Sequence, residues 1–393
     1  VNRPAFRDTG MARTEDGVRD LWIERAARRL GFARLARAAG WEGGAAYLLV
    51  AAVVVVHIPL LSAVGWLQTG TLSMVVNPGE VFQIPAWLGV VWIMHRLKRR
   101  YARAVADLPD AVDQDISEFD PEGSLSRPVT TALGVPGAGD SKEAVAIDSV
   151  VSDRVVAAIV LVGWTLYGTQ LVMNPAGLIG PVAELTGPAV AAIRFYVIIP
   201  LALYPIGGEL LGLIVGTLVM LPLKIRRAGQ IDFSDPHGAG GLAPVGRLFK
   251  SIAVTYFVLL ALFTTFQTVA VGADPTSLFS STFILAGLAF GVVLFFGPLL
   301  WLRGYIRAAK EHKIEVLAQR TSDIGDTGDR FPYAEPASPE ETSRYLYERL
   351  RMDQIERTSE LPLDTGVLQE VLFALVLPYV TSIAFDYLLA AGV

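Results

Sequence analysis

The chain contains no cysteine among its 393 residues. This absence excludes disulfide bonds, thiolate metal sites and a cysteine nucleophile. Charged residues are also scarce, at 18% of the sequence, whereas soluble domains contain about a quarter. No uniformly basic surface is expected, which argues against nucleic acid as a partner. A long chain with so little charge and 52% hydrophobic residues is expected to lie in a membrane.

Long apolar runs are what the sequence has instead. A helix of about 20 residues spans a bilayer, and seven runs approach or exceed that length, at 45–67, 80–97, 153–174, 189–222, 249–272, 279–302 and 367–391. The predicted fold class is all-α: a polytopic integral membrane protein with seven transmembrane helices, and the lipid bilayer as its first partner. Arginine is common, lysine is scarce and the loops are acidic, which suits the cell membrane of a salt-adapted or GC-rich prokaryote.

Basic clusters at the ends of the runs predict the orientation. They occur at 25–37, 95–100, 223–227 and 302–313, whereas the turns near 68–80, 174–188 and 272–278 carry almost no lysine or arginine. The N-terminus is therefore predicted to be cytoplasmic and the C-terminus outside, with short outer turns. The predicted units are an N-terminal cytoplasmic segment (1–44), hairpin 1 (45–103), an acidic cytoplasmic loop (104–152), hairpin 2 (153–230), a Gly-rich cytoplasmic elbow (231–248), hairpin 3 (249–313), a cytoplasmic loop with a helix (314–366) and span 7 (367–393).

Two cytoplasmic helices are predicted outside the runs. Near the N-terminus, apolar residues from Trp22 to Ala33 recur at helical spacing among arginines, which indicates an amphipathic helix on the membrane surface. Before the last run, Ser338 suits the N-cap, Pro339 the first helical position and Glu341 a capping box. A helix of about 18 residues, or five turns, is expected to follow.

The fourth run contains the clearest intramembrane ionisable residue, Glu209. Such residues are costly in a membrane and usually functional. Pro200, Pro205, Gly207 and Gly208 precede it, and a broken helix beside a carboxylate can hold a cation in a transporter or channel. A wet kink or a structural pair is the alternative. The run is long enough, at roughly 50 Å of helix, to be one bent helix or to include a re-entrant turn.

Other polar residues in the runs have weaker signals. Arg194 and Asp386 are expected near the outer ends of their spans, where snorkelling to the headgroups is favoured over a mutual ion pair. Gln267, with Thr264, could line a polar path or satisfy neighbouring backbone groups, and the second interpretation is favoured. Additional pore-lining candidates in the last run are Tyr379, Thr381 and Ser382.

Residues 232–247, "DFSDPHGAGGLAPVGR", are the most polar and Gly-rich stretch beside any run. Their side chains and glycines allow two interpretations. Carboxylate and imidazole ligands suit a divalent cation, and successive free N–H groups suit an anion, but the spacing matches no strong metal signature. A rigid connection is favoured, and no metal site is predicted. The candidate residues are Asp232, Asp235, His237, Gly238, Gly240 and Gly241.

Two resemblances bear on the chain. The segment "DPHGAGGLAPVG" resembles a Pro-Asp/His-Gly-x-Gly-Gly-Leu stretch of uncharacterised multi-pass membrane proteins of prokaryotes, including haloarchaea, and it implies no activity. The layout of seven runs is similar in topology to the seven-helix ion channel superfamily of insect chemoreceptors. That similarity implies a tetrameric cation channel whose last helix lines the pore.

Three classes of function follow from the sequence. The first is an oligomeric cation channel of this inverted seven-helix type, formed by a homo-oligomer. The second is a transporter that uses an intramembrane carboxylate, and the third is a membrane anchor or scaffold whose cytoplasmic loops bind a protein partner. No nucleophile–base pair can be named, so no enzymatic activity and no cofactor are predicted, and a metal-dependent membrane enzyme using the Gly-rich stretch is the least favoured class.

Overall fold

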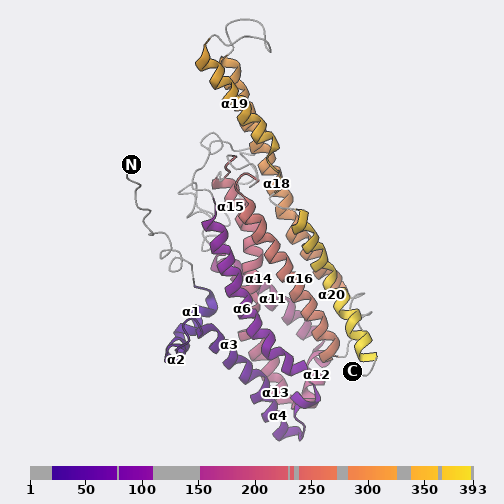
Figure 1. Cartoon of the computed structure of the whole chain (residues 1–393). Coiled ribbons are helices and arrows are strands. Elements are labelled where there is room, and N and C mark those ends of the chain that lie inside the picture. The colour runs from indigo at the N-terminus through magenta and orange to yellow at the C-terminus, as the bar shows by residue number, and fades with distance from the viewer. Residues whose placement is uncertain are drawn as a thin grey trace.

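A computed structural model of the chain describes residues 20–77, 79–108, 151–228, 231–233, 239–271, 282–324, 338–361 and 365–390. Every regular element in these ranges is a helix, and the long helices lie side by side in one elongated bundle (Figure 1). The all-α prediction is therefore confirmed.

The N-terminal part forms a bent pair of short helices followed by a long hairpin. Helices α1 (Trp22–Arg29) and α2 (Phe32–Ala38) meet at Gly31, whose φ of 88° favours glycine. From here on, the name elbow refers only to residues 20–44, and not to the Gly-rich segment 231–248. The chain then runs through α3 (Ala45–Val55), the π-helix η1 (Val56–Leu60) and α4 (Leu61–Thr69), and returns through α5 (Ser73–Val76) and α6 (Gly79–Ala106).

Helix α11 (Asp153–Met173) begins at Ser152, whose side chain accepts a hydrogen bond from the N–H of Val155. The next segment, expected as a turn, is instead the helix α12 (Pro175–Thr186). Asn174 caps it by accepting from the N–H of Gly177, and Pro175 occupies its first turn. An asparagine at the N-cap and a proline in the first turn both favour helix initiation. They explain why this apolar stretch is a helix and not an irregular turn.

The fourth run is one continuous helical path, so of the two alternatives left open the structure has the single long helix and not the re-entrant turn. It consists of α13 (Pro188–Ile193), the π-helix η2 (Arg194–Leu203), α14 (Tyr204–Val215), the π-helix η3 (Gly216–Met220) and α15 (Leu221–Ala228). Pro200 lies within η2, and Pro205 lies in the first turn of α14. Neither proline has an N–H to donate to the preceding turn, and the carbonyl of Pro200 accepts instead from Trp164 Nε1 of α11 at 2.7 Å.

The C-terminal half extends beyond the rest of the bundle. Helix α16 (Ala243–Val271) is followed by α18 (Thr282–Ile324), α19 (Pro339–Arg357) and α20 (Thr365–Ala390). The predicted helix after Ser338 is confirmed, with Pro339 as its first residue. In Figure 1, α18 and α19 form an arm that projects past α15, and α20 returns along α16.

Five helical segments in the described part of the chain are long and apolar enough to cross a membrane: Ala45–Thr69, Asp153–Met173, Pro188–Arg226, Ala243–Thr264 and Leu285–Ser322. They support a polytopic, membrane-embedded protein. Helices α6 and α20 cover the two remaining predicted runs, with 28 and 26 residues, but they are not among these five.

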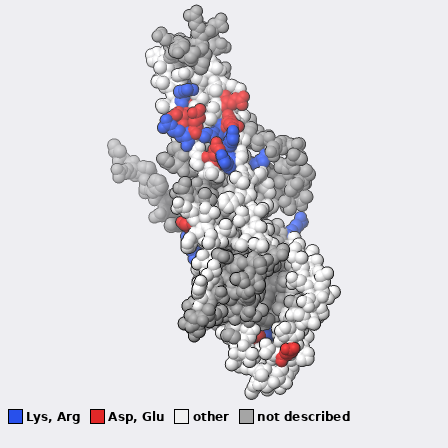
Figure 2. Space-filling model, turned by 90° about the vertical axis from the view of Figure 1, so that its right-hand side faces the viewer, with Lys and Arg blue, Asp and Glu red and all other residues white. Residues whose placement is uncertain are grey.

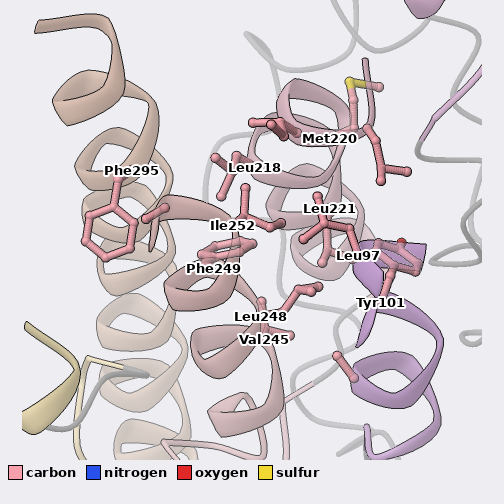
Figure 3. Close-up of a cluster of buried hydrophobic side chains, with 14 of the residues drawn as sticks. Leu97, Tyr101, Leu218, Met220, Leu221, Val245, Leu248, Phe249, Ile252 and Phe295 are labelled. Atoms are coloured by element: carbon pink, nitrogen blue, oxygen red, sulfur yellow. The ribbon is translucent and has the colours of Figure 1, made fainter. Parts of the chain in front are cut away.

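The core of the bundle lies between α6, α15, α16 and α18. Figure 3 shows Leu97 and Tyr101 of α6 facing Leu218 and Leu221 of the long fourth helix, with Phe249 of α16 beside them. By contrast, α11 packs on α14 through glycines: a Cβ on Gly208 would lie 2.4 Å from Val160 Cγ2, and one on Gly212 would lie 2.8 Å from Val156 Cγ2. This is the close approach that a small-xxx-small stripe permits between membrane helices.

Candidate functional site

Two groups of buried polar residues lie inside this apolar bundle. The first, which we call the Arg194 cluster, consists of Ser62 on α4, Ser73 on α5, Glu80 on α6 and Arg194 at the start of η2. The second, the Glu209 latch, consists of the carboxylate of Glu209 on α14 and the backbone N–H groups of Trp22 and Ile23 on α1. Each group joins elements that are far apart in the sequence.

Every polar contact in the Arg194 cluster is short. Arg194 Nη1 lies 2.5 Å from Glu80 Oε1, and Arg194 Nη2 donates to Ser62 Oγ at 3.0 Å. Glu80 Oε2 accepts from Ser62 at 3.0 Å and from Ser73 at 2.8 Å. Only 5% of Arg194 and 8% of Glu80 is exposed. The snorkelling interpretation of Arg194 is therefore wrong, because its guanidinium has an ion-pair partner inside the bundle.

Burial makes this ion pair sensitive to any change in its partners. Two charges taken out of water are stabilised only when the geometry is good and the remaining lone pairs are satisfied. Ser62 and Ser73 satisfy the second oxygen of Glu80. The cluster thus closes one end of the bundle with a neutral pair, and losing one charge would leave the other buried alone.

His57 lies close to this pair on the π-helix η1, and Pro59 lies in the same segment. Its ring hydrogen-bonds Gln83 of α6 and is within electrostatic reach of both Arg194 and Glu80. Two buried nitrogens here have no hydrogen-bond partner among the described residues, His57 Nδ1 and Arg194 Nε. An imidazole with a free ring nitrogen beside an ion pair is a group that can take up or pass on a proton.

The Glu209 latch is a helix cap made by a residue from another helix. Glu209 Oε2 accepts from the N–H of Ile23 at 3.0 Å, and Oε1 accepts from the N–H of Trp22. The first N–H groups of a helix have no partner within it, and its positive dipole end favours a carboxylate. Glu209 is 3% exposed, so these two donors provide the polar contacts that its burial requires.

Glu24 fixes the same helix to α6. Its carboxylate lies 2.9 Å from His95 Nε2, accepts from Lys98 Nζ at 3.0 Å and accepts from the N–H of Leu21 at 2.8 Å. Burial acts to raise the pKa of Glu24, but hydrogen bonds from His95 and Lys98 and the Lys98 charge outweigh it and lower this pKa to about 2. Glu24 is thus held as a carboxylate that bridges α1 to α6.

The position of Glu209 follows from the helix that it caps. Arg28 and Arg29 of α1 are exposed, and exposed arginines belong at the membrane–water interface and not in the hydrocarbon layer. Because the Glu209 carboxylate caps the first residues of α1, Trp22 and Ile23, it lies at the level of the elbow. Its role as an ion-coupling residue stays a prediction, and the contacts that it makes here are structural.

The Gly-rich stretch is described only in part, since Asp235, His237 and Gly238 lie outside the described residues. Asp232 donates its N–H to the carbonyl of Gly240 at 3.0 Å. Gly240 and Gly241 have positive φ values of 68° and 81°, and a Cβ on Gly240 would lie 2.9 Å from Ile231. These residues form a tight, inward-packed connection, and no metal-binding group of three or more His, Asp or Glu side chains occurs in the described chain.

The remaining predicted residues belong to helices whose side chains are partly outside the described set. Gln267 lies on α16, and Tyr379, Thr381 and Ser382 lie on α20, but their side chains are not described. Thr264 is described, and its hydroxyl donates to the carbonyl of Ala261 at 2.8 Å. Thr264 therefore satisfies a backbone group, as expected.

Sequence reasoning missed the partners in both groups. Glu80, Ser62 and Ser73 were not singled out, because a serine within a run, a serine in a turn and a carboxylate at the start of a run are each ordinary. A carboxylate at the start of the second run, 80–97, was the one available signal for Glu80. Comparisons with protein-family models, curated proteins and solved structures find no match to this chain, so its function must be argued from these contacts.

Proposed function

We propose that this protein is a multi-spanning membrane transporter that couples the movement of its substrate to protons at the Arg194 cluster and His57. The observation that carries this proposal is a buried Arg194–Glu80 ion pair beside a histidine with an unpartnered Nδ1. Chains of carboxylate and imidazole groups within a membrane are typical of proton relays. His57 would accept the proton at Nδ1, and the ion pair would respond to the new charge.

The helices that carry these groups are suited to small movements. His57 lies on η1, and Arg194 is the first residue of η2. A π-helical segment holds an extra residue in its turn, so its conversion to α-helix shifts the register of the residues on one side. Such segments are frequent at functional sites. A proton on His57 could therefore favour a different register of η1 or η2.

The described face of α20 favours this transporter over the oligomeric channel. Residues Phe373, Val376, Val380 and Tyr387 are all at least half exposed and none is charged. Such side chains suit lipid or a neighbouring helix better than an aqueous pore. The channel and the homo-oligomer remain predictions, and they would need the side chains of Tyr379, Thr381 and Ser382 to face a shared axis.

The transporter is proposed to have seven spans, with the five apolar segments joined by α6 and α20. Helix α6 is long enough for this at 28 residues, and its first half is mostly apolar. Helix α20 has 26 residues. With seven crossings, the elbow and the α18–α19 arm lie on the cytoplasmic side, in agreement with the basic run ends.

The proposal is tested by a proton-binding measurement that needs no substrate. Purified protein in liposomes is adsorbed on a solid-supported membrane, and the buffer is stepped from neutral to strongly acidic pH, because a buried imidazole beside the Arg194 cation takes up a proton only in acid. Proton uptake at a buried site produces a transient current. We expect this current from the wild-type protein and its loss in His57→Gln, which keeps an amide to bond Gln83.

A matched variant in this experiment is His312→Gln, since His312 lies on the polar part of α18. It should keep the transient current. A wild-type current no larger than that of empty liposomes, or an unchanged current in His57→Gln, would contradict the proposal.

One observation favours the scaffold as a second candidate. The α18–α19 arm projects from the bundle (Figure 1), and α19 exposes Leu346, Tyr347 and Leu350 by 53%, 60% and 69%. Such a surface on a polar arm could bind a cytoplasmic protein. Under this candidate, deleting 338–358 abolishes cellular function while the pH-induced current of the purified protein is absent in the wild type.

A further inference from the structure

The elbow combines exposed arginines with exposed large apolar side chains. Trp22, Leu30, Leu35 and Trp41 are exposed by 40%, 67%, 60% and 47%. Arginines 28, 29, 34 and 37 are exposed on the same two short helices. Apolar side chains beside basic ones are the composition of a helix that lies in the interface of a bilayer.

Most of the acidic side chains near the elbow already form ion pairs with basic side chains. Asp20 pairs with Arg28, Asp153 pairs with Arg25, and Glu24 is bound by Lys98 and His95. In the described ranges, no carboxylate lies within ion-pair distance of the other three arginines, Arg29, Arg34 and Arg37. The elbow therefore presents three arginines outside any ion pair and one exposed carboxylate, Glu42, so its exposed charge is positive overall.

The elbow is also fixed at the start of a membrane span. Trp41 stacks on Tyr47 of α3 at 5.4 Å between ring centroids, and Tyr47 stacks on His95 of α6 at the same distance. Tryptophan and tyrosine are enriched at the level of the lipid headgroups. The first apolar segment begins at Ala45, directly after the elbow. The three arginines thus lie where headgroup phosphates are found.

We propose that the elbow is a docking surface for anionic phospholipids of the adjacent leaflet, with Arg29, Arg34 and Arg37 binding their phosphodiester groups. A guanidinium can hold a phosphate through two parallel hydrogen bonds. The exposed Leu30, Leu35 and Trp41 enter the acyl region beside the bound headgroups. This inference does not rest on the proposed transport activity.

The test uses the absence of native cysteine. Leu35→Cys is labelled with an environment-sensitive fluorophore, and the purified full chain is titrated in detergent micelles with brominated phosphatidylglycerol or brominated phosphatidylcholine. Bromine quenches only a fluorophore that it touches, so the signal reports lipid at the elbow. Phosphatidylglycerol should reach half-quenching at a concentration at least tenfold lower than phosphatidylcholine, because each arginine near a membrane surface adds roughly a fivefold preference for anionic lipid.

The variant Arg29→Gln/Arg34→Gln/Arg37→Gln should lose this preference, which corresponds to roughly a hundredfold for three arginines. A control with three exposed arginines of α19 replaced, Arg344→Gln/Arg349→Gln/Arg357→Gln, should keep it. The proposal would be overturned by equal quenching with the two lipids in the parent protein. It would also be overturned by an unchanged preference in the elbow variant.

Discussion

At the scale of single residues, Glu209 shows how a buried carboxylate can be held by backbone groups. Its two oxygens accept from the N–H groups of Trp22 and Ile23, and Ile23 is fully buried. An acidic side chain in an apolar run is thus accounted for by a helix that arrives from outside the run. The sequence gives no sign of this partner, because the contact joins residues 186 positions apart.

Glu209→Ala is expected to free the start of α1. The two N–H groups lose their acceptors, which costs about 2 kcal/mol, whereas Glu209→Gln keeps one acceptor oxygen and loses less. Hydrogen–deuterium exchange of residues 20–26 measures this directly. Faster exchange in the alanine variant, with the glutamine variant intermediate, is the expected order. Equal exchange in all three proteins would show that the latch does not hold α1.

Glu24 predicts how the elbow responds to acid. Its pKa is lowered to about 2 from an ordinary 4.5, so the ionised form stabilises the docked elbow. This contribution is fully present above about pH 4.5 and is lost as the pH falls towards about 2. Fluorescence of a label at Leu35→Cys should change across this range and should not do so in Glu24→Gln. A transition of equal size in both proteins would assign the effect to other groups.

The Arg194 cluster predicts a strong coupling between two charges. Arg194→Gln should cost about 3–5 kcal/mol because Glu80 is left buried without its cation. Adding Glu80→Gln should recover much of that loss, since the pair is then neutral. Denaturant unfolding in detergent of both single variants and the double variant measures the coupling. Additive losses would mean that the two side chains do not act as a pair.

At the scale of elements, the contact between α11 and α14 depends on one face of a glycine stripe. Gly208→Ala places a methyl group 2.4 Å from Val160 Cγ2, whereas nothing lies within 4 Å of a Cβ on the neighbouring Gly207. We expect Gly208→Ala to lower stability by about 1–3 kcal/mol. Gly207→Ala should be neutral or slightly stabilising, because alanine favours helix. Thermal unfolding compares the two, and equal effects would contradict the packing.

The helices themselves were largely predictable from the sequence. Apolar runs located the long helices, and Ser338 and Pro339 located the start of α19. What the runs could not reveal are the π-helical segments, because proline at 59 or 200 is equally compatible with a kink. Helix α12 was missed because its 12 residues are too few to span a bilayer and were taken for a turn.

The candidate site was predictable only one residue at a time. Arg194 stood out as a charged residue in an apolar run, but Glu80 did not, and nothing in a single sequence pairs residues 114 positions apart. The Gly-rich stretch attracted attention through its composition. Its described residues are nevertheless explained by positive φ at Gly240 and Gly241 and by close packing on Ile231.

At the scale of the whole molecule, charged side chains are concentrated in one part of the bundle and sparse in the rest. On the face shown in Figure 2, lysine, arginine and acidic residues gather along the α18–α19 arm, and the described surface below it is almost entirely uncharged. This agrees with an apolar part in the bilayer and a polar arm in water. The number of crossings decides on which side that arm lies relative to the elbow.

The central claim, seven crossings with the elbow and the arm on the same side, is tested most directly by cysteine labelling. Ala39→Cys, Ser343→Cys and Thr71→Cys are introduced singly into the cysteine-free chain and labelled from one side of sealed vesicles with a membrane-impermeant reagent. Seven spans predict labelling of residues 39 and 343 from the same side and of residue 71 from the other, because six crossings separate 39 from 343. If only the five apolar segments cross, residues 39 and 343 would be labelled from opposite sides, and the account would be wrong.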